Sequence, residues 1–318
     1  MSIDWNGIIL DAPSPAAAWT EIFAALLALS KATSSPVALH DATVVPDRLL
    51  AEAAWELWEA FPLQAETTAD HLKAWAAADP AGKAVLILDA LSLRELPIIL
   101  GAAETRGVEP VQVRVTGSAC PSTTDHFAKS LGLPGRSALA NNNKPGTLAL
   151  FGGDCYTEVV GLPFADCAVP PSPNLLFWHT WLDDLIHLQK KLPDQVATIA
   201  ADTLQSDGFW GFLDRLRQGR NLVITSDHGY AVSKRFSSEV EDPEAIDILR
   251  TTFGASRNRA AGEPWQKRFM PPMVLTHNNQ HVIMGQRKWK APGGFPHLCH
   301  GGMSLLEVAV PFVEFPAR

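Results

Sequence analysis

The stretch NLVITSDHGYAV, residues 221–232, decides the fold class of this chain. Its apolar and β-branched residues, 222–225, are typical of a strand that is buried on both faces. The strand is followed at once by Asp227 and His228, an acid and an imidazole, and then by Gly229. In open α/β sheets, ligands bind outside the carboxyl ends of the strands, so this pair predicts a binding site. We expect added bulk at Gly229 to crowd whatever binds there.

Helical and strand-like segments alternate along the rest of the chain. The run KAVLILDALS at 83–92 is continuously apolar and stops at Asp89, as expected of a central parallel strand. Other predicted strands are 36–45, 110–117, 147–152, 272–277 and 281–286. Predicted helices are 16–32, 47–61, 68–80, 93–106 and 175–192, and one or two more over 194–219. Residues 134–146 are predicted to form a surface loop. The alternation predicts an α/β fold with a mainly parallel central sheet and helices on both faces.

Length and composition narrow the class of protein. At 318 residues we expect one large domain with embellishments. Hydrophobic residues make up 47% of the chain, yet no charge-free apolar stretch is long enough to span a membrane, and the N-terminus lacks a signal-peptide pattern. We therefore expect a cytoplasmic protein without a membrane partner. The net charge of −8 argues against non-specific wrapping of duplex nucleic acid.

Six acids and imidazoles stand in contexts typical of metal ligands. Asp183 and His187 are four residues apart, so a helix would place them on one face, one turn from each other. Alone, such a pair is often a surface pair, and an acid after a strand often caps a helix. The co-occurrence of several ligand-like elements favours a site for two divalent cations. The candidate ligands are Asp89, Asp183, His187, Asp227, His228 and His300.

Hydroxyl groups that could act as a nucleophile lie in the stretch ACPSTTDHF. It places Ser122, Thr123 and Thr124 where a predicted strand turns into a helix. A helix N-terminus favours negative charge, and a metal ion would lower the pKa of the hydroxyl further. Ser and Thr are also favoured helix caps, so a purely structural role stays open.

In their order and context, these elements resemble the PglZ family of the alkaline phosphatase superfamily. The resemblance rests on VLILDALSLRE, PSTT, the DxxxH of Asp183 and His187, ITSDHG and HGGMSLLEVAVPFV. It implies an alkaline-phosphatase-like catalytic domain over 81–318, with a helix-rich N-terminal segment over 1–80 packed on the core. It also implies a metal-dependent phosphoric ester hydrolase that works by two in-line displacements through a covalent phospho-enzyme.

The resemblance also assigns roles to single residues. Thr124 is the implied nucleophile, with Thr123, Ser122 and Ser92 as alternatives. The cofactors are expected to be two zinc ions. One ion would be held by Asp183, His187 and His300, and the other by Asp89, Asp227, His228 and the oxygen of the nucleophile. Supporting or packing roles are expected for His126, His179 and His297, while Arg94 would either reach the phosphate or form a surface ion pair.

A basic stretch predicts how a phosphate ester is bound. Residues 250–290 contain eight Lys or Arg side chains against the single acid Glu263, with aromatic residues between them. Such a surface can hold a phosphate backbone and stack bases, although a solvated face explains it equally well. The predicted substrate-binding residues are Lys129, Arg257, Arg259, Lys267 and Arg268.

The function that this resemblance implies is that of a two-metal phosphodiesterase or phosphatase in bacterial phage defence or signalling. Its expected substrate is a phosphate ester such as an oligonucleotide or a cyclic nucleotide. The alternative is a catalytically inactive PglZ-like scaffold that binds partner proteins in a defence or signalling complex through its Trp-rich N-terminal helices. Sulfate-ester chemistry is disfavoured because CPSTT lacks the C-x-P-x-R pattern of sulfatases.

Overall fold

The computed structural model describes residues 3–33, 35–78, 82–143, 145–151, 154–188, 192–236, 238–262, 265 and 269–318. In these ranges the chain is built around a six-stranded sheet with the order β2-β13-β5-β1-β4-β3. The strands are β1 Lys83–Leu88, β2 Gln112–Gly117, β3 Tyr156–Val160, β4 Asn174–His179, β5 Asn221–Thr225 and β13 Ala309–Phe315.

The central sheet is mainly parallel. Strand β1 pairs in parallel with β4 and with β5, and β3 pairs in parallel with β4. Strand β13 runs antiparallel to both of its neighbours, β5 and β2. All six residues of β1 are buried, which explains why its sequence is continuously apolar rather than alternating. The sheet confirms the predicted fold class.

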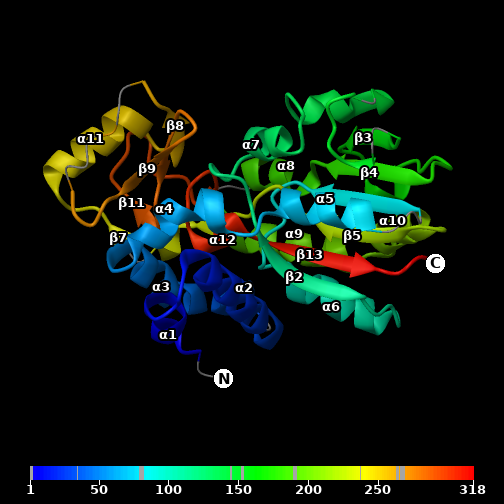
Figure 1. The fold of residues 1–318 in the computed structure, drawn as a ribbon, viewed down its shortest axis with the longest axis horizontal. Coiled ribbons are helices and arrows are strands. Elements are labelled where there is room, and N and C mark those ends of the chain that lie inside the picture. Colours follow the sequence, from blue (N-terminus) through cyan, green and yellow to red (C-terminus); the bar gives the residue numbers. More distant parts are fainter. Residues whose placement is uncertain are drawn as a thin grey trace.

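Helices cover both faces of this sheet (Figure 1). On one face, Val85 and Ile87 pack in one hydrophobic cluster with Leu72 of α5 and Phe127 of α7. On the other face, Leu86 of the same strand belongs to the larger cluster that includes residues of α2, α6, α9 and α10. The helices just mentioned are α2 Pro15–Ala32, α5 Thr68–Ala78, α6 Leu96–Thr105, α7 Thr124–Ser130, α9 Pro193–Gln205 and α10 Asp207–Arg217. Among the described helices, none has the length and apolar character that crossing a membrane requires.

The first 78 residues are helical wherever the structure describes an element. Besides α2 and α5, they form α1 Trp5–Leu10, α3 Pro36–Glu52 and α4 Trp55–Gln64. The predicted strand at 36–45 is wrong, because this segment is the first part of α3. Its buried residues Leu39, Thr43 and Leu50 recur at helical spacing, so packing outweighs the β-branched residues between them. The division into 1–80 and 81–318 stays a prediction.

A smaller β-rich region lies beside the central sheet, on the left in Figure 1. Its three-stranded sheet has the order β8-β10-β9, and the predicted strands at 272–277 and 281–286 supply the β9–β10 hairpin. The elements between β5 and α12 in the chain are β6 Ala231–Val232, η4 Ser233–Arg235, β7 Ser238–Glu239, α11 Pro243–Phe253, β8 Asn258–Ala260, β9 Val274–His277, β10 Gln280–Ile283, β11 Arg287–Lys288 and β12 Leu298–Cys299. Helix α12, Leu305–Val308, then leads back to β13.

Two other predicted elements differ from the structure. The predicted helix at 175–192 is strand β4 followed by α8, Trp181–Leu188, because residues 175–178 are buried on both faces of the sheet. The predicted strand at 147–152 forms no strand over 147–151, and residue 152 lies outside the described residues. Within the predicted loop 134–146, residues Arg136–Asn142 form the 3-10 segment η1. A further 3-10 turn, η3, spans Phe164–Asp166.

Candidate metal centre

Two carboxylates lie side by side at the carboxyl ends of β1 and β5. Asp89 follows β1 directly, and Asp227 lies two residues beyond β5. The N–H of Ala90 donates a hydrogen bond of 3.0 Å to Asp227 Oδ1, and Ser226 Oγ donates one of 2.8 Å to the carbonyl oxygen of Leu88. Because the two strands are neighbours and their ends are bonded to each other, the two carboxylates are held in a fixed relation.

Each of these carboxylates has one oxygen held by donors and one oxygen facing the centre. Asp89 Oδ2 accepts hydrogen bonds from Trp178 Nε1 at 3.0 Å and from Arg136 Nη1. Asp89 Oδ1 lies 3.8 Å from His228 Nε2, and Asp227 Oδ2 lies 3.4 Å from the same nitrogen. This arrangement leaves one oxygen of each acid free to act as a ligand.

The tautomer of His228 follows from its contacts. Its Nδ1 lies 3.0 Å from the carbonyl oxygen of Gly229, which can only accept a hydrogen bond. Nδ1 therefore carries a hydrogen, and Nε2 faces the two carboxylates. Burial disfavours the charged ring, but the negative charges of Asp227 and Asp89 raise the pKa of His228 above its ordinary value. A metal ion bound at Nε2 would replace the proton that these carboxylates favour there.

Thr124 is the hydroxyl residue that faces this group. Thr124 Oγ1 donates a hydrogen bond of 2.8 Å to Asp227 Oδ2, and it lies 3.4 Å from both Asp89 Oδ1 and His228 Nε2. The other candidates have different partners: Ser122 Oγ donates to Gly302, Thr123 Oγ1 pairs with His126, and the buried Ser92 Oγ accepts from Arg94.

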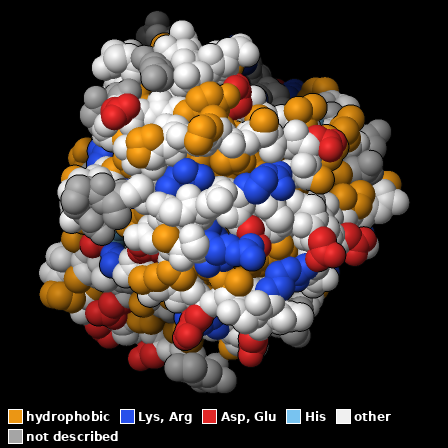
Figure 2. Space-filling view, turned by 90° about the vertical axis from the view of Figure 1, so that its right-hand side faces the viewer, with side chains coloured by type: hydrophobic (Ala, Val, Ile, Leu, Met, Phe, Trp, Pro, Cys, Tyr) orange, Lys and Arg blue, Asp and Glu red, His pale blue; other side chains and the backbone are white. Residues whose placement is uncertain are grey.

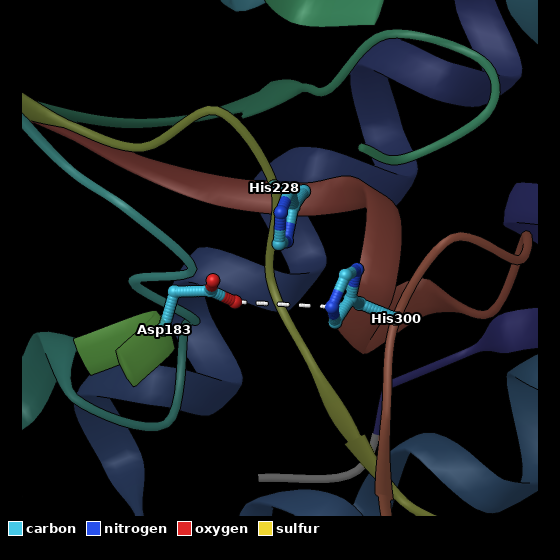
Figure 3. A group of neighbouring side chains, drawn as sticks. All are labelled: Asp183, His228 and His300. Atoms are coloured by element: carbon cyan, nitrogen blue, oxygen red, sulfur yellow. Dashed lines mark ion pairs between the residues drawn. The ribbon is translucent and has the colours of Figure 1, made fainter. Parts of the chain in front are cut away.

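A second group of possible ligands, Asp183, His228 and His300, is drawn in Figure 3 and shares His228 with the first group. Asp183, in the first turn of α8, and His300, which follows β12, have Oδ1 and Nε2 atoms 3.8 Å apart. The rings of His228 and His300 stack with centroids 4.4 Å apart. His187 lies one turn further along α8, with Nε2 3.4 Å from Asp183 Oδ1, but its side chain is 62% exposed.

The compact groups of possible ligands share one residue. Asp89, Asp227 and His228 form one group, and Asp183, His228 and His300 form the other, with ligand atoms within 4.8 Å of one another in each. The prediction paired His187, rather than His228, with Asp183 and His300. The six predicted ligands thus lie in one place, although His187 stands outside both compact groups.

The electrostatics of the centre fit a cation. Burial and the neighbouring Asp227 raise the pKa of Asp89 well above its ordinary value, and burial raises the pKa of Asp183. Burial lowers the pKa of His300 well below its ordinary value, with His228 and His187 adding to the effect. Asp183 Oδ1 is also buried and accepts no hydrogen bond from the described residues. Carboxylates and imidazoles that lie together with few other partners are the donor set that divalent transition metals bind.

Arg136 is a site residue that sequence analysis did not find. Its Nη1 pairs with Asp89 Oδ2, and its side chain stays 30% exposed at the edge of the centre. The 3-10 segment η1 that carries it is attached to β3, because Thr157 Oγ1 donates 2.9 Å to the carbonyl of Leu139. Nothing in the letters PGRS distinguishes Arg136 from a loop residue, so its position depends on the folding of η1.

The predicted substrate-binding residues are scattered. Arg257 is only 1% exposed and forms a bidentate ion pair with Glu307, so its assignment to a substrate surface is wrong. Arg259 is exposed and donates a hydrogen bond to the carbonyl of Thr252, and Lys129 is exposed on α7. Neither pairs with a ligand carboxylate in the described residues. Lys267 and Arg268 lie outside the residues that the structure describes.

Several basic side chains are visible on the end of the molecule that carries the C-terminus (Figure 2). Two arginines near this end are mostly buried: Arg217 Nε donates a hydrogen bond of 2.9 Å to the carbonyl of Pro316, and Arg220 Nη1 donates one of 2.8 Å to that of Ser172. Because β5 begins right after Arg220, this is the amino end of the parallel strands, opposite to the candidate centre.

Four other residues that the sequence singled out, Arg94, His126, His179 and His297, lie in packing or hydrogen-bond contacts of the fold. His179 stacks on Phe164 with ring centroids 4.1 Å apart. Arg94 is 4% exposed and lies over the ring of Tyr230, so it forms no surface ion pair. His126 bonds to Thr123, as stated above, and the N–H of Ser233 donates to the carbonyl of His297.

A Cβ at Gly229 would lie 2.2 Å from the carbonyl oxygen of Leu306, so the backbone of α12 and not a ligand excludes a larger residue there.

Comparison with known proteins identifies no family for this chain. No protein-family model and no curated protein match the sequence. Solved structures similar to it include phosphonoacetate hydrolase from Sinorhizobium meliloti 1021 in complex with phosphonoformate, with 16% identity, a TM-score of 0.42 and coverage of 75% of this chain and 90% of that one. Murine ectonucleotide pyrophosphatase/phosphodiesterase 5 shows 12% identity, a TM-score of 0.44 and coverage of 73% and 87%. The PglZ assignment therefore stays a prediction.

Proposed function

We propose that this protein is a hydrolase of phosphate esters that uses two divalent metal ions and Thr124 as the nucleophile. One observation carries the proposal: Thr124 Oγ1 lies 2.8 Å from Asp227 Oδ2, beside two compact groups of possible ligands that share His228. These surroundings support a role for the Thr124 hydroxyl as a nucleophile. Thr124 would attack an electrophile bound between the two groups of ligands.

Asp89, Asp227, His228 and Thr124 would hold one metal ion, and Asp183, His187 and His300 would hold the other. When bound, the two ions would supply positive charge to the attacking and the leaving oxygens of an in-line displacement and would lower the pKa of the hydroxyl. Their ligands, carboxylates with imidazoles, suit zinc, and we propose Zn²⁺ as the natural ion.

The chain's own residues suggest the course of the displacement. The hydroxyl hydrogen of Thr124 points to Asp227 Oδ2, which leaves a lone pair on Oγ1 free to attack phosphorus. As the Oγ1–phosphorus bond forms, the bond from phosphorus to the leaving oxygen breaks, the hydroxyl proton would be lost to solvent water, and the leaving oxygen would take up a proton from that water. Water then attacks the phosphothreonine, which releases phosphate or the phosphate monoester and regenerates Thr124.

Arg136 is the proposed anion-binding residue. Among the described residues, it is the Lys or Arg that forms an ion pair with a ligand carboxylate, and a guanidinium has further N–H groups for phosphoryl oxygens. Asp89 would then orient Arg136 while Arg136 holds the substrate. Replacing Arg136 by alanine should raise KM more than it lowers kcat, whereas the exposed Arg259, replaced in the same way, should change neither.

Within the class of phosphate esters, we propose a nucleotide or oligonucleotide substrate and a role in bacterial phage defence or signalling. The resemblance to PglZ sequences supports this finer proposal. The basic surface supports it less than expected, because Arg257 is buried. A panel of bis(p-nitrophenyl) phosphate, p-nitrophenyl phosphate, cyclic nucleotides and short oligonucleotides separates diesters from monoesters.

A comparison of two neighbouring threonines tests the proposed function. Thr124→Ala should lower the hydrolysis of bis(p-nitrophenyl) phosphate by about a thousandfold or more, because the nucleophile is lost. Thr123→Ala is the matched control, since Thr123 Oγ1 bonds to His126 rather than to the acids, and it should retain most of the activity. Activity that vanishes on dialysis against a chelator and returns with Zn²⁺ would agree with the proposal. Equal activity of Thr124→Ala and wild type would rule out Thr124 as the nucleophile, and metal-free protein without any hydrolysis would favour the inactive scaffold.

A further inference from the structure

The loop of residues 301–304, directly after His300, follows a tightly fixed path. Gly301 has a φ of +90°, a left-handed conformation that glycine adopts without strain. A Cβ at Gly302 would lie 2.4 Å from Arg257 Nε. The side chains around this loop therefore determine where its backbone runs, and with it the position of His300.

Glu307 holds the loop from one side. Its Oε1 accepts a hydrogen bond of 3.0 Å from the N–H of Gly302. Its Oε2 accepts hydrogen bonds from the N–H of Ser304 at 3.1 Å and from Ser304 Oγ at 2.7 Å. Glu307 is fully buried, so these bonds form away from water, where they define the loop geometry strongly.

Arg257 in turn fixes Glu307. Its Nε donates 2.7 Å to Oε1 and its Nη2 donates 2.8 Å to Oε2, a bidentate pair with little freedom to rotate. The guanidinium also donates to the carbonyls of Arg287 and Gly285. Buried ion pairs often add little net stability, because desolvation offsets their attraction, so a role in fixing geometry explains this pair better than stability does.

Ser122 joins the same loop to the turn that carries Thr124. Ser122 Oγ donates 2.7 Å to the carbonyl of Gly302 and accepts a hydrogen bond of 3.0 Å from the N–H of Gly301. Ser122 is fully buried and lies two residues before Thr124. One hydroxyl thus bonds the N–H of Gly301 and the carbonyl of Gly302, in the loop that directly follows His300.

We infer that Ser122 and Glu307 are positioning residues that hold His300 at a fixed distance from Thr124. Arg257 orients Glu307, Glu307 holds the 301–304 loop, and Ser122 ties this loop to the turn of the nucleophile. The inference rests on the proposed function, because it concerns the geometry of metal binding by Asp183, His187 and His300. Loss of these hydrogen bonds to the 301–304 loop should weaken the binding of the ion that His300 holds. The binding of the ion at Asp89 and Asp227 should not change.

Ser122→Ala is the direct test, and Ser30→Ala is its matched control. Ser30 is also fully buried, and its Oγ donates a single hydrogen bond, to the carbonyl of Leu93, away from the centre. Zn²⁺ affinities are measured by competition with a chelator, and the coordination of each ion is followed through the visible absorption of the Co²⁺-loaded protein. In Ser122→Ala, one of two ions should bind about 10–100-fold more weakly and its Co²⁺ absorption should change. In Ser30→Ala, both affinities and the absorption should match wild type.

Glu307→Gln provides a second variant with the same expected pattern, since glutamine keeps the shape of the side chain but cannot accept all of these hydrogen bonds. The inference is overturned if Ser122→Ala binds both ions with the affinities of wild type. It is also overturned if Ser122→Ala and Ser30→Ala lower the affinities for both ions by the same factor. Wild-type protein that binds two ions but hydrolyses no ester would overturn the proposed function alone, and the comparison of affinities would still decide the role of Ser122.

Discussion

Trp178 Nε1 donates a hydrogen bond of 3.0 Å to Asp89 Oδ2, so strand β4 fixes the carboxylate that follows strand β1. The register places Leu88 opposite His179 and Ile87 opposite Trp178, which brings the indole next to Asp89. Both residues are fully buried. The sheet itself therefore orients this candidate ligand, with one oxygen held and the other directed to Thr124.

Trp178→Phe removes this donor and keeps most of the ring packing on Phe127. We expect metal affinity at the group of Asp89, Asp227 and His228 to fall by about 10–100-fold, because a carboxylate without its supporting hydrogen bond is less well oriented. Isothermal titration of metal-free protein with Zn²⁺ measures the effect. Unchanged affinities would mean that the indole bond has no part in orienting Asp89.

The control for this variant is Trp210→Phe. Trp210 Nε1 is also buried and donates 2.9 Å to the carbonyl of Leu204, at a distance from the centre. It should lose a similar hydrogen bond and similar stability while its Zn²⁺ affinities stay at the wild-type values. Equal losses of affinity in the two variants would point to general destabilisation.

Asp183→Asn should have opposite effects on stability with and without metal. Burial raises the pKa of Asp183, so its charged form is disfavoured in the metal-free protein, and Oδ1 accepts no hydrogen bond from the described residues. In the presence of a chelator at pH 7, we expect the variant to gain about 1 kcal/mol in free energy of unfolding. With excess Zn²⁺ the wild type should be the more stable protein, because ligand binding stabilises the folded state.

Chemical denaturation in the chelator and in Zn²⁺ measures both effects. The neighbouring Asp184→Asn is the control, since Asp184 is exposed and accepts from Thr180 Oγ1 rather than facing the ligand groups. Its stability should respond to Zn²⁺ as that of wild type does. An Asp183→Asn protein stabilised by Zn²⁺ as much as wild type would remove Asp183 from the ligand set.

The parts of the fold that the sequence predicts well are those in which one signal dominates. Strands β1 and β5 are short, continuously apolar and end in polar residues, and both are central strands. Strand β4 was missed because its apolar run, 174–179, passes into the helical pattern of α8 after a single residue, Thr180. Over such a distance periodicity does not separate a buried strand from a buried helix.

The residues of the candidate centre also fall into those that the sequence predicts and those that it does not. Asp89 and Asp227 follow strands that can be recognised from sequence, so their proximity is predictable from the rule that parallel strands end at one edge of a sheet. Arg136 reaches Asp89 only through the path of η1, and the buried role of Arg257 depends on its partner Glu307, 50 residues further along. Long-range pairing of this kind leaves no local pattern in the sequence.

The free energy of unfolding should fall with pH below neutrality, in part because of His40. Burial, followed by the charge of Arg94, lowers the pKa of His40 from 6.5 to about 4. Between these two pH values the unfolded chain binds a proton that the folded protein does not, so stability is fully present above pH 6.5 and is lost as pH falls toward 4. One such group contributes on the order of 3 kcal/mol across this window.

Urea denaturation of wild type and His40→Leu at pH 4.5, 5.5, 6.5 and 7.5 measures this contribution. The variant should lose less stability on acidification than wild type does. It should not become independent of pH, because burial also lowers the pKa of His179 to about 4. Parallel curves for the two proteins would show that His40 titrates in the folded state as it does in the unfolded chain.

Gly229→Ala should destabilise the protein by more than about 2 kcal/mol, and Gly101→Ala should stabilise it slightly. A Cβ at Gly229 would lie 2.2 Å from the carbonyl oxygen of Leu306. Because this oxygen belongs to the backbone, the clash can be relieved only by moving α12 or the segment after β5. At Gly101, inside α6, no atom lies within 4 Å of the added Cβ, so the helix gains about 0.5–1 kcal/mol from the higher helix propensity of alanine. Thermal unfolding of both variants compares the two positions. If Gly229→Ala lost metal affinity without losing stability, crowding of the ions rather than contact with Leu306 would be the cause.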